Sequence, residues 1–255
     1  AKDRKQFGKA IIEFPAVYDM LATMKAKLDA GRSLLYQTSR YVDIYKALDD
    51  IARERKLTPE ERQEQKRFAK MADAFTPLAK GMNSEYANQN AYDCIQIHGG
   101  SGFMMEYACQ RIYRDARITS IYEGTTQLQT VAAIRYVTNG SYAATLHEYE
   151  AIPCAPEYQG YMDRLKAMTG KLEACTTKVK EAQNQELLDF TSRRLYEMAA
   201  VCVMSHLLLQ DANKAPELFA QSLDVYVNYA EAEVEKHYSF IQHFQAEELE
   251  NYRKA

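Results

Sequence analysis

The chain has 255 residues, with 32 Lys and Arg against 35 Asp and Glu, which gives a formal net charge of −3. Because both signs are interspersed, no broad cationic field exists to collect phosphate backbones, and a nucleic-acid binder is disfavoured. Only 10 Gly and 6 Pro occur, and so few turn-forming residues disfavour sandwiches and barrels and favour long helices.

Apolar run lengths and cysteine spacing indicate the compartment. The longest apolar run, Met198 to Met204, is far shorter than the roughly 18 residues of a membrane span. The cysteines are scattered and never spaced as CxxC, which disfavours a disulfide framework and a zinc site. We therefore expect a soluble, cytoplasmic protein with no metal site. The chain begins at Ala1 without a methionine, so we also expect it to be part of a longer gene product.

The first predicted helix is long and amphipathic. It begins near Phe14 and runs to about residue 50, where steps of three, four and seven draw one apolar stripe: Phe14, Val17, Leu21, Met24, Leu28, Leu35, Val42 and Tyr45. A helix of this length spans on the order of 50 Å at 1.5 Å per residue. We therefore expect it to pack lengthwise against other helices.

Capping signals place the next three helices. The sequence Thr-Pro-Glu-Glu at 58–61 supplies an N-cap, a first-turn proline and acidic residues, and predicts the start of a second helix. A third helix is predicted over residues 83–97, stopped by His-Gly-Gly-Ser-Gly at 98–102. We expect a short irregular stretch through Arg117, and then a helix from about Thr125 to Val137 that ends at Asn-Gly 139–140.

The second half of the chain reads as a separate helical unit. Glycine and proline between residues 139 and 160 predict a boundary or linker. Three apolar rhythms of step three and four follow, in the segments 165–179, 188–209 and 223–244, and short connections between them predict an up-down bundle. The predicted fold is therefore all-α, with one helical domain over residues 1–142 and a second, small helical bundle over residues 143–255.

Three segments could carry chemistry. The glycines in 96–103 let the backbone approach a ligand and turn N–H groups outward, as phosphate recognition requires, although a helix C-cap would use the same glycines. Glu123 precedes a glycine and a helix, where it could be an acid favoured by the helix dipole or a catalytic base whose pKa rises on desolvation. The basic residues in 4–8 could bind a ligand or be solvated.

Taken together in this order, four motifs resemble the C-terminal half of the flavin-dependent acyl-CoA dehydrogenases. They are Arg-x-x-Phe-Gly from Arg4, Gln-Ile-x-Gly-Gly-x-Gly-Phe from Gln96, Arg-Asp-Ala-Arg-Ile from Arg114 and Ile-Tyr-Glu-Gly-Thr-x-Gln from Ile121. The resemblance covers residues 1 to about 140. In the family this helical domain follows an N-terminal helical domain and a β domain that hold much of the flavin and thioester, so we expect the fragment alone not to turn over.

The resemblance implies a role for each matching residue. Glu123 would remove the α-proton of an acyl-CoA thioester while the β-hydrogen leaves as hydride to FAD, which gives the trans-2-enoyl-CoA. Its own backbone N–H would stabilise the thioester oxygen, and its neighbours Tyr122 and Gly124 would contact the substrate. The residues implied to contact FAD are Arg4, Phe7, Gln96, Gly99, Gly100, Thr125 and Gln127.

The family pattern also implies partners. FAD contacts in the family are typically completed by a neighbouring subunit, so a homo-oligomer is implied, and an electron-transfer flavoprotein would accept the electrons. Residues after about Ala143 resemble the additional helical domain of longer bacterial members, where we expect a packing or oligomerisation role. A second hypothesis is a non-catalytic helical assembly or scaffold module derived from this family. A gene product that purifies yellow would favour the enzyme.

Overall fold

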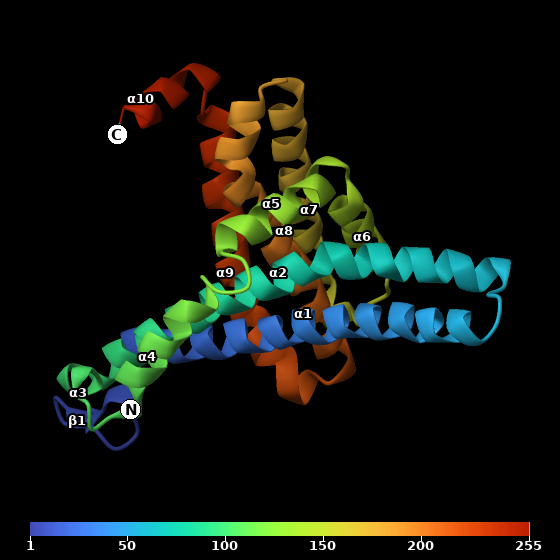
Figure 1. Cartoon of the computed structure of the whole chain (residues 1–255). Helices are drawn as coiled ribbons and strands as arrows, with labels where there is room; N and C mark the ends of the chain where they lie inside the picture. The colour runs from blue at the N-terminus through green and yellow to red at the C-terminus, as the bar shows by residue number, and fades with distance from the viewer. Residues whose placement is uncertain (255) are drawn as a thin grey trace.

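The computed structural model describes residues 1–254, and helices dominate it (Figure 1). The helices are α1 (Pro15–Glu54), α2 (Pro59–His98), α3 (Gly100–Phe103), α4 (Ala108–Thr119), α5 (Thr126–Thr138), α6 (Ser141–Glu150), α7 (Gln159–Glu181), α8 (Gln185–Lys214), α9 (Pro216–His243) and α10 (Leu249–Arg253). Short 3-10 turns cover Ile11–Glu13, Pro156–Tyr158 and Ala246–Glu248, and β1 (Lys5–Gln6) pairs antiparallel with β2 (Lys9–Ala10). The predicted all-α fold is confirmed. Within residues 1–254, no helix has the length and apolarity that a bilayer crossing requires.

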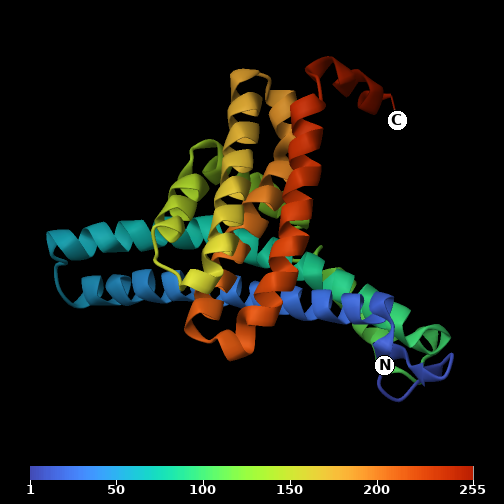
Figure 2. The same cartoon turned by 180° about the vertical axis from the view of Figure 1, so that it is seen from behind.

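Helices α1 and α2 form a long pair that lies side by side (Figures 1 and 2). The predicted start of α2 is confirmed, because the Thr58 hydroxyl accepts a hydrogen bond from the N–H of Glu61 at 3.2 Å while the Glu61 carboxylate accepts from the N–H of Thr58 at 2.9 Å. This reciprocal capping satisfies two backbone donors that the first helical turn leaves free.

Helices α7, α8 and α9 lie side by side and run across this pair (Figure 2). In helix α8, nearly every residue from Leu195 to Leu209 is buried. A single apolar cluster joins it to α1, α2, α5, α6, α7 and α9. Polar contacts add to this packing, because Ser222 Oγ on α9 donates to Asp29 on α1 at 2.5 Å and Ser33 Oγ on α1 donates to Asp211 on α8 at 2.5 Å.

The predicted third helix at 83–97 is wrong as a separate element, because α2 continues unbroken from Pro59 to His98. An internal proline removes one helical hydrogen bond, and α2 contains Pro77. Buried tyrosine hydroxyls pack around this point. Tyr196 donates to the carbonyl of Pro77 at 3.0 Å and Tyr142 to that of Ala74 at 2.5 Å. Tertiary packing therefore carries the helix through the proline.

The expected irregular stretch through Arg117 is also wrong, because residues 108–119 form α4. Among the described residues of α4, only Cys109 is buried, so the helix lies on the surface. A surface helix with one buried residue offers little apolar burial by which it could be predicted from its sequence. Contact with α2 supports it, since Asn88 Nδ2 donates to the carbonyl of Ala116 at 3.0 Å.

The apolar stripe predicted for α1 is not its buried face. Leu28 and Leu35 are 47% and 46% exposed. The buried face instead holds mostly other residues, namely Ala26, Ala30, Leu34, Tyr41 and Leu48. The face with small residues packs on α2 because the two helices approach closely there: a Cβ built on Gly31 would lie 2.2 Å from Asn83 Oδ1 of α2. Close approach of two helix backbones thus selects small side chains over large ones.

Candidate functional site

Glu123 lies on a tight corner between α4 and α5. Its φ is +51° and that of Gly124 is +91°, so two successive residues adopt the left-handed conformation. Within residues 1–254, three non-glycine residues have positive φ: Phe7, Glu123 and Gln183. Such a backbone costs of order 1–3 kcal/mol for a residue with a Cβ and persists where its surroundings hold it in place. Two of these three residues were predicted as site residues from the sequence.

Side chains of α2 and α5 hold this corner. The carbonyl of Gly124 accepts hydrogen bonds from Lys80 Nζ at 2.5 Å and from Gln129 Nε2 at 3.3 Å, and the carbonyl of Glu123 accepts from Gln129 Nε2 at 3.4 Å. A Cβ on Gly124 would lie 2.8 Å from Gln129 Nε2. Lys80 Nζ is also 5.8 Å from the ring centroid of Tyr122. The carbonyls are therefore fixed while the Glu123 side chain stays exposed.

The carboxylate and the backbone N–H of Glu123 are free. Among the described residues, neither its carboxylate nor its backbone N–H makes a hydrogen bond or an ion pair. An exposed carboxylate and a free N–H on one rigid residue can act on adjacent atoms of one ligand. The arrangement therefore provides a base and a hydrogen-bond donor at the same place.

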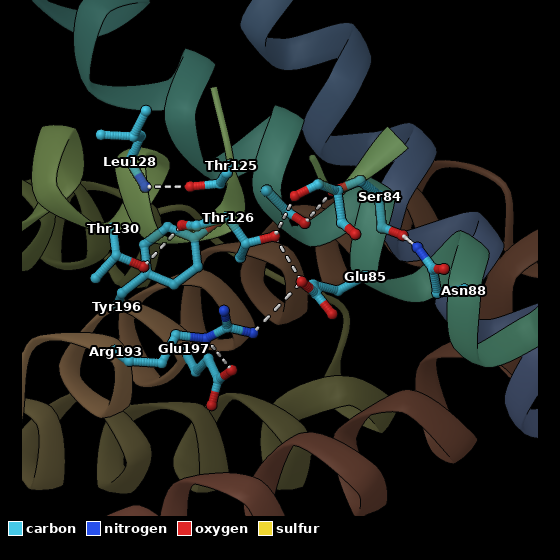
Figure 3. A network of polar contacts seen from close by, with 12 residues as sticks. Ser84, Glu85, Asn88, Thr125, Thr126, Leu128, Thr130, Arg193, Tyr196 and Glu197 are labelled. Carbon is cyan, nitrogen blue, oxygen red and sulfur yellow. Dashed lines mark hydrogen bonds and ion pairs between the residues drawn. The ribbon is translucent and has the colours of Figure 1, made fainter. Parts of the chain in front are cut away.

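A polar network fixes the start of α5 (Figure 3). Thr125 is the N-cap, and its hydroxyl accepts from the N–H of Leu128 at 3.3 Å. Thr126 Oγ1 donates to Glu85 of α2 at 2.6 Å, and Arg193 of α8 lies 3.8 Å from the same Glu85 oxygen. This network connects the corner to the body of the molecule through three helices.

Sequence analysis did not identify the supporting residues of this site. They are Lys80, Glu85, Gln129 and Arg193. Gln129 lies two positions after the motif residue Gln127, so it could have been suspected from its place in the chain. The others lie in the middle of helices far away in sequence and carry no local signal. Only the packing of α2 and α8 against α5 brings them to the corner.

The same network includes a partly buried ion pair. Burial by itself raises the pKa of the Glu197 carboxyl, but His237 and Arg193 outweigh burial and hold its pKa below the ordinary value of 4.5. Glu197 lies 2.9 Å from His237 Nε2 and 2.5 Å from Arg193 Nε. A lowered folded-state pKa contributes stability above pH 4.5 that is lost as the pH falls towards the folded-state value.

We expect Glu197→Gln to lower the free energy of unfolding at pH 7 by about 1–3 kcal/mol, because it removes the carboxylate nearest to Arg193 and leaves that guanidinium with the more distant Glu85 alone. The difference from the unchanged protein should shrink as the pH falls below 4.5. Urea unfolding followed by circular dichroism over this pH range measures both effects. The exposed Glu54→Gln serves as the control and should change neither. A difference that grows on acidification would contradict the stated role of Glu197.

A second group of predicted residues surrounds a cavity at the end of the long helix pair where α2 stops. Arg4 Nη1 donates to the carbonyl of His98 at 3.0 Å, and a Cβ on Gly99 would lie 3.0 Å from the same nitrogen. Arg4, Phe7, Gln96 and Gly99 line this cavity of about 430 Å³. A guanidinium, an aromatic ring that is 88% exposed and a glycine with positive φ thus face one space. Gly100 follows directly as the first residue of α3.

These two groups lie at opposite ends of α4. The structure brings Arg4, Phe7, Gln96 and Gly99 together at one end, and residues 122–127 together at the other. The 12-residue helix between them is about 18 Å long at 1.5 Å per residue. One end of α4 therefore offers a cation, an aromatic ring and glycine backbone, which suit a nucleotide pyrophosphate, and the other offers a carboxylate.

The surface around both groups exposes many large apolar side chains. They come from the α3–α4 region and from α5 and include Phe103, Met105, Tyr107, Ile112, Ile118, Leu128 and Val131. Contiguous exposed apolar surface is typical of a face that contacts another domain, another subunit or a ligand. The site residues therefore lie among exposed apolar side chains that could take part in such a contact.

Two models of known protein families together match almost the whole chain. Residues 1–136 match the model described as "Acyl-CoA dehydrogenase, C-terminal domain". Residues 138–249 match a second model, "Acyl-CoA dehydrogenase C terminal". The first match contains both groups of predicted site residues, and the second contains α7, α8 and α9.

Several proteins are similar to about half of the chain. A caffeyl-CoA reductase-Etf complex subunit, CarC, of Acetobacterium woodii is 37% identical over 51% of this chain and 28% of its own length. The (2S)-methylsuccinyl-CoA dehydrogenase of Cereibacter sphaeroides is 33% identical over 53% of this chain and 20% of its own. The 3-methylmercaptopropionyl-CoA dehydrogenase of Ruegeria pomeroyi is 39% identical over 47% and 18%. The matched region is thus less than a third of each of these relatives.

A solved structure shares the fold over nearly the full chain. An acyl-CoA dehydrogenase of Bacillus anthracis, complexed with FAD, superposes with a TM-score of 0.73 at 22% identity. The superposition covers 94% of this chain and 44% of that one. The packing of α7, α8 and α9 on the first helices therefore has a counterpart in a solved structure.

Proposed function

This chain belongs to the acyl-CoA dehydrogenase family, whose members depend on FAD, and on that premise we propose that it supplies the catalytic base of an acyl-CoA dehydrogenation. The reaction is the α,β-dehydrogenation of an acyl-CoA thioester to the trans-2-enoyl-CoA. The observation that carries the proposal is the geometry of Glu123, an exposed, unpaired carboxylate on a left-handed corner whose carbonyls are held by Lys80 and Gln129.

Glu123 takes the proton from the carbon α to the thioester carbonyl. A carboxylate can act on such a weakly acidic C–H only if the charge that develops on the thioester oxygen is stabilised at the same time. The free backbone N–H of Glu123 donates to that oxygen, and Tyr122 and Gly124 line the substrate beside it. The bound carbonyls hold the backbone of this corner, and so they fix where the N–H and the Cβ of Glu123 lie.

The cavity at the other end of α4 holds the adenosine diphosphate end of FAD. Arg4 neutralises phosphate charge, Phe7 packs on the nucleotide, and Gln96 with Gly99 and Gly100 lets backbone N–H groups approach the pyrophosphate. Thr125 and Gln127 contact FAD near the N-terminus of α5, where anions are favoured. When bound, FAD accepts the β-hydrogen as hydride.

The family resemblance and the exposed apolar surface support an oligomer. In the proposed homo-oligomer, the base end and the nucleotide end of one chain serve flavins in two different sites, so that the subunits share their cofactors. The exposed apolar surface around both groups is available for that contact. An electron-transfer flavoprotein reoxidises the flavin, in line with the Etf complex named for the Acetobacterium woodii relative. We place the enzyme in the cytoplasm.

We expect Arg4→Ala and Gln96→Ala to weaken FAD binding by the complete gene product by about ten- to a hundredfold, since each removes a hydrogen bond to a charged phosphate. Flavin content after dialysis, read from the absorbance of the purified protein, measures this loss. The control is Arg62→Ala at the exposed start of α2, which should keep full occupancy. Full flavin occupancy in both variants would contradict these contacts, and a colourless unchanged protein would favour a scaffold role.

A further inference from the structure

The short loop that carries Glu123 is closed by Thr126, the first residue of α5. The N–H of Thr126 donates to the carbonyl of Ser120 at 3.1 Å, so residues 121–125 form a loop between these two positions. Ser120 and Thr126 are both 5% exposed, whereas the side chain of Glu123 is exposed. The two ends of the loop are therefore buried, and the position of Glu123 depends on the residues that hold these ends.

Glu85 of α2 holds the end of the loop at Thr126. The hydroxyl of Thr126 donates to Glu85 Oε1 at 2.6 Å, and a hydrogen bond to a carboxylate is stronger than one between neutral groups. The Glu85 side chain is 27% exposed, and a carboxylate that is largely removed from water needs a counter-charge or further donors. Among the described residues, Arg193 is the one cation within ion-pair distance of Glu85.

Arg193 reaches Glu85 from α8, in the second half of the chain (Figure 3). Its guanidinium lies 3.8 Å from Glu85 Oε1, the same oxygen that accepts from Thr126. Glu197, four positions further along α8, lies 2.5 Å from Arg193 Nε and holds the guanidinium from its own helix. A chain of polar contacts therefore runs from α8 through α2 to the loop of Glu123.

We propose that Arg193 is a positioning residue for the catalytic base. It acts through Glu85 and Thr126, which keep the loop of Glu123 in the geometry for proton abstraction. A small displacement of a catalytic group can slow a reaction strongly, so loss of this support should lower the rate of the proton step without weakening ligand binding. The inference rests on the proposed role of Glu123, and it gives the second half of the chain a part in the reaction.

Arg193→Gln in the complete gene product should slow flavin bleaching by an acyl-CoA substrate by about tenfold. Acyl-CoA binding and flavin content should stay unchanged, since a lower rate with intact binding is what a misplaced base produces. Arg193→Lys keeps the charge and should recover most of the rate. The matched control is Arg194→Gln, because that guanidinium lies over the ring of Phe240 on α9, 3.7 Å from its centroid. Undiminished bleaching in Arg193→Gln, or an equal loss in the control, would overturn the proposal.

Amide hydrogen exchange separates this inference from the assignment of the base. It is measured on the complete gene product without substrate, so its result does not depend on which carboxylate takes the proton. Arg193→Gln should speed exchange in a peptide that covers residues 121–128, because local opening becomes easier there, and should leave a peptide from α7 unchanged. Unchanged exchange in residues 121–128 would overturn the support by Arg193. Faster exchange with normal bleaching would overturn its positioning role, while Glu123→Gln decides separately whether Glu123 is the base.

A double-mutant cycle tests the route from α8 to the loop. Thr126→Val keeps the shape of the side chain but removes the hydroxyl, so it should also slow bleaching and speed exchange, whereas Thr126→Ser should recover most of the rate. If Arg193 acts through Thr126, adding Arg193→Gln to Thr126→Val should slow bleaching little further, because residues of one network are not additive. Two effects that multiply in the double variant would overturn this route.

Discussion

Replacement of Glu123 with Gln in the complete gene product is expected to slow flavin reduction by an acyl-CoA substrate by about a hundredfold to ten-thousandfold, the range typical of a lost general base. Gln keeps the size and the backbone N–H of the residue but cannot take the α-proton. FAD content and acyl-CoA binding should therefore stay close to those of the unchanged protein. Anaerobic bleaching of the flavin absorbance, followed by stopped flow, measures the rate.

A second measurement isolates the proton step. Exchange of the substrate α-hydrogen with deuterated solvent needs the base but not hydride transfer, so Glu123→Gln should lose this exchange as well. Glu106→Gln, in the exposed connection before α4, provides a matched control with unchanged bleaching and exchange. Rapid bleaching in the Glu123 variant would assign the base to a carboxylate elsewhere in the protein.

We expect Gly81→Ala to lower the free energy of unfolding by about 2–3 kcal/mol, because a methyl group there overpacks the core. A Cβ on Gly81 would lie 2.0 Å from the hydroxyl of Tyr196. That ring is fully buried, and its hydroxyl donates to the carbonyl of Pro77, so the ring can move only by giving up a buried hydrogen bond. Thermal and urea unfolding measure the loss.

The matched control is Gly170→Ala on α7, where a Cβ meets no atom within 4 Å. There the higher helix propensity of Ala should stabilise the protein by up to about 1 kcal/mol. Gly81 also lies against Gln129, which holds the Glu123 corner. Gly81→Ala should therefore slow flavin bleaching too, whereas Gly170→Ala should not. Equal stability of the two variants would contradict the packing of Tyr196 against Gly81.

Sequence patterns predicted the structure correctly where the interactions join residues that are close together in the chain. The capping residue Thr58, the start of a helix near Thr125 and the stop at Gly99 were predicted correctly, because a cap depends on a few neighbouring groups. The order of the four motifs likewise identified the family, as residues 1–136 confirm. The roles assigned to Glu123 and to the FAD residues remain predictions that the experiments above address.

Tertiary contacts overrode local pattern in three places. The helix predicted to start at residue 83 is the second half of α2, surface residues 108–119 are helical, and the apolar stripe predicted for α1 is not its buried face. In each case the deciding interactions join distant segments, such as Tyr196 with Pro77 or Asn83 with Gly31. Periodicity within one segment contains no information about which partner helix will cover it.

Composition and short motifs are enough to predict the helical class, the helix caps and the family of this protein, because each depends on residues that are close together in the chain. The contact of Arg4 with His98, 94 positions away, and the support of the Glu123 corner by Lys80 and Gln129 arise only when the helices pack. Such meetings depend on how closely α1, α2, α5 and α8 pack, and close packing is set by the combined shapes of all their side chains.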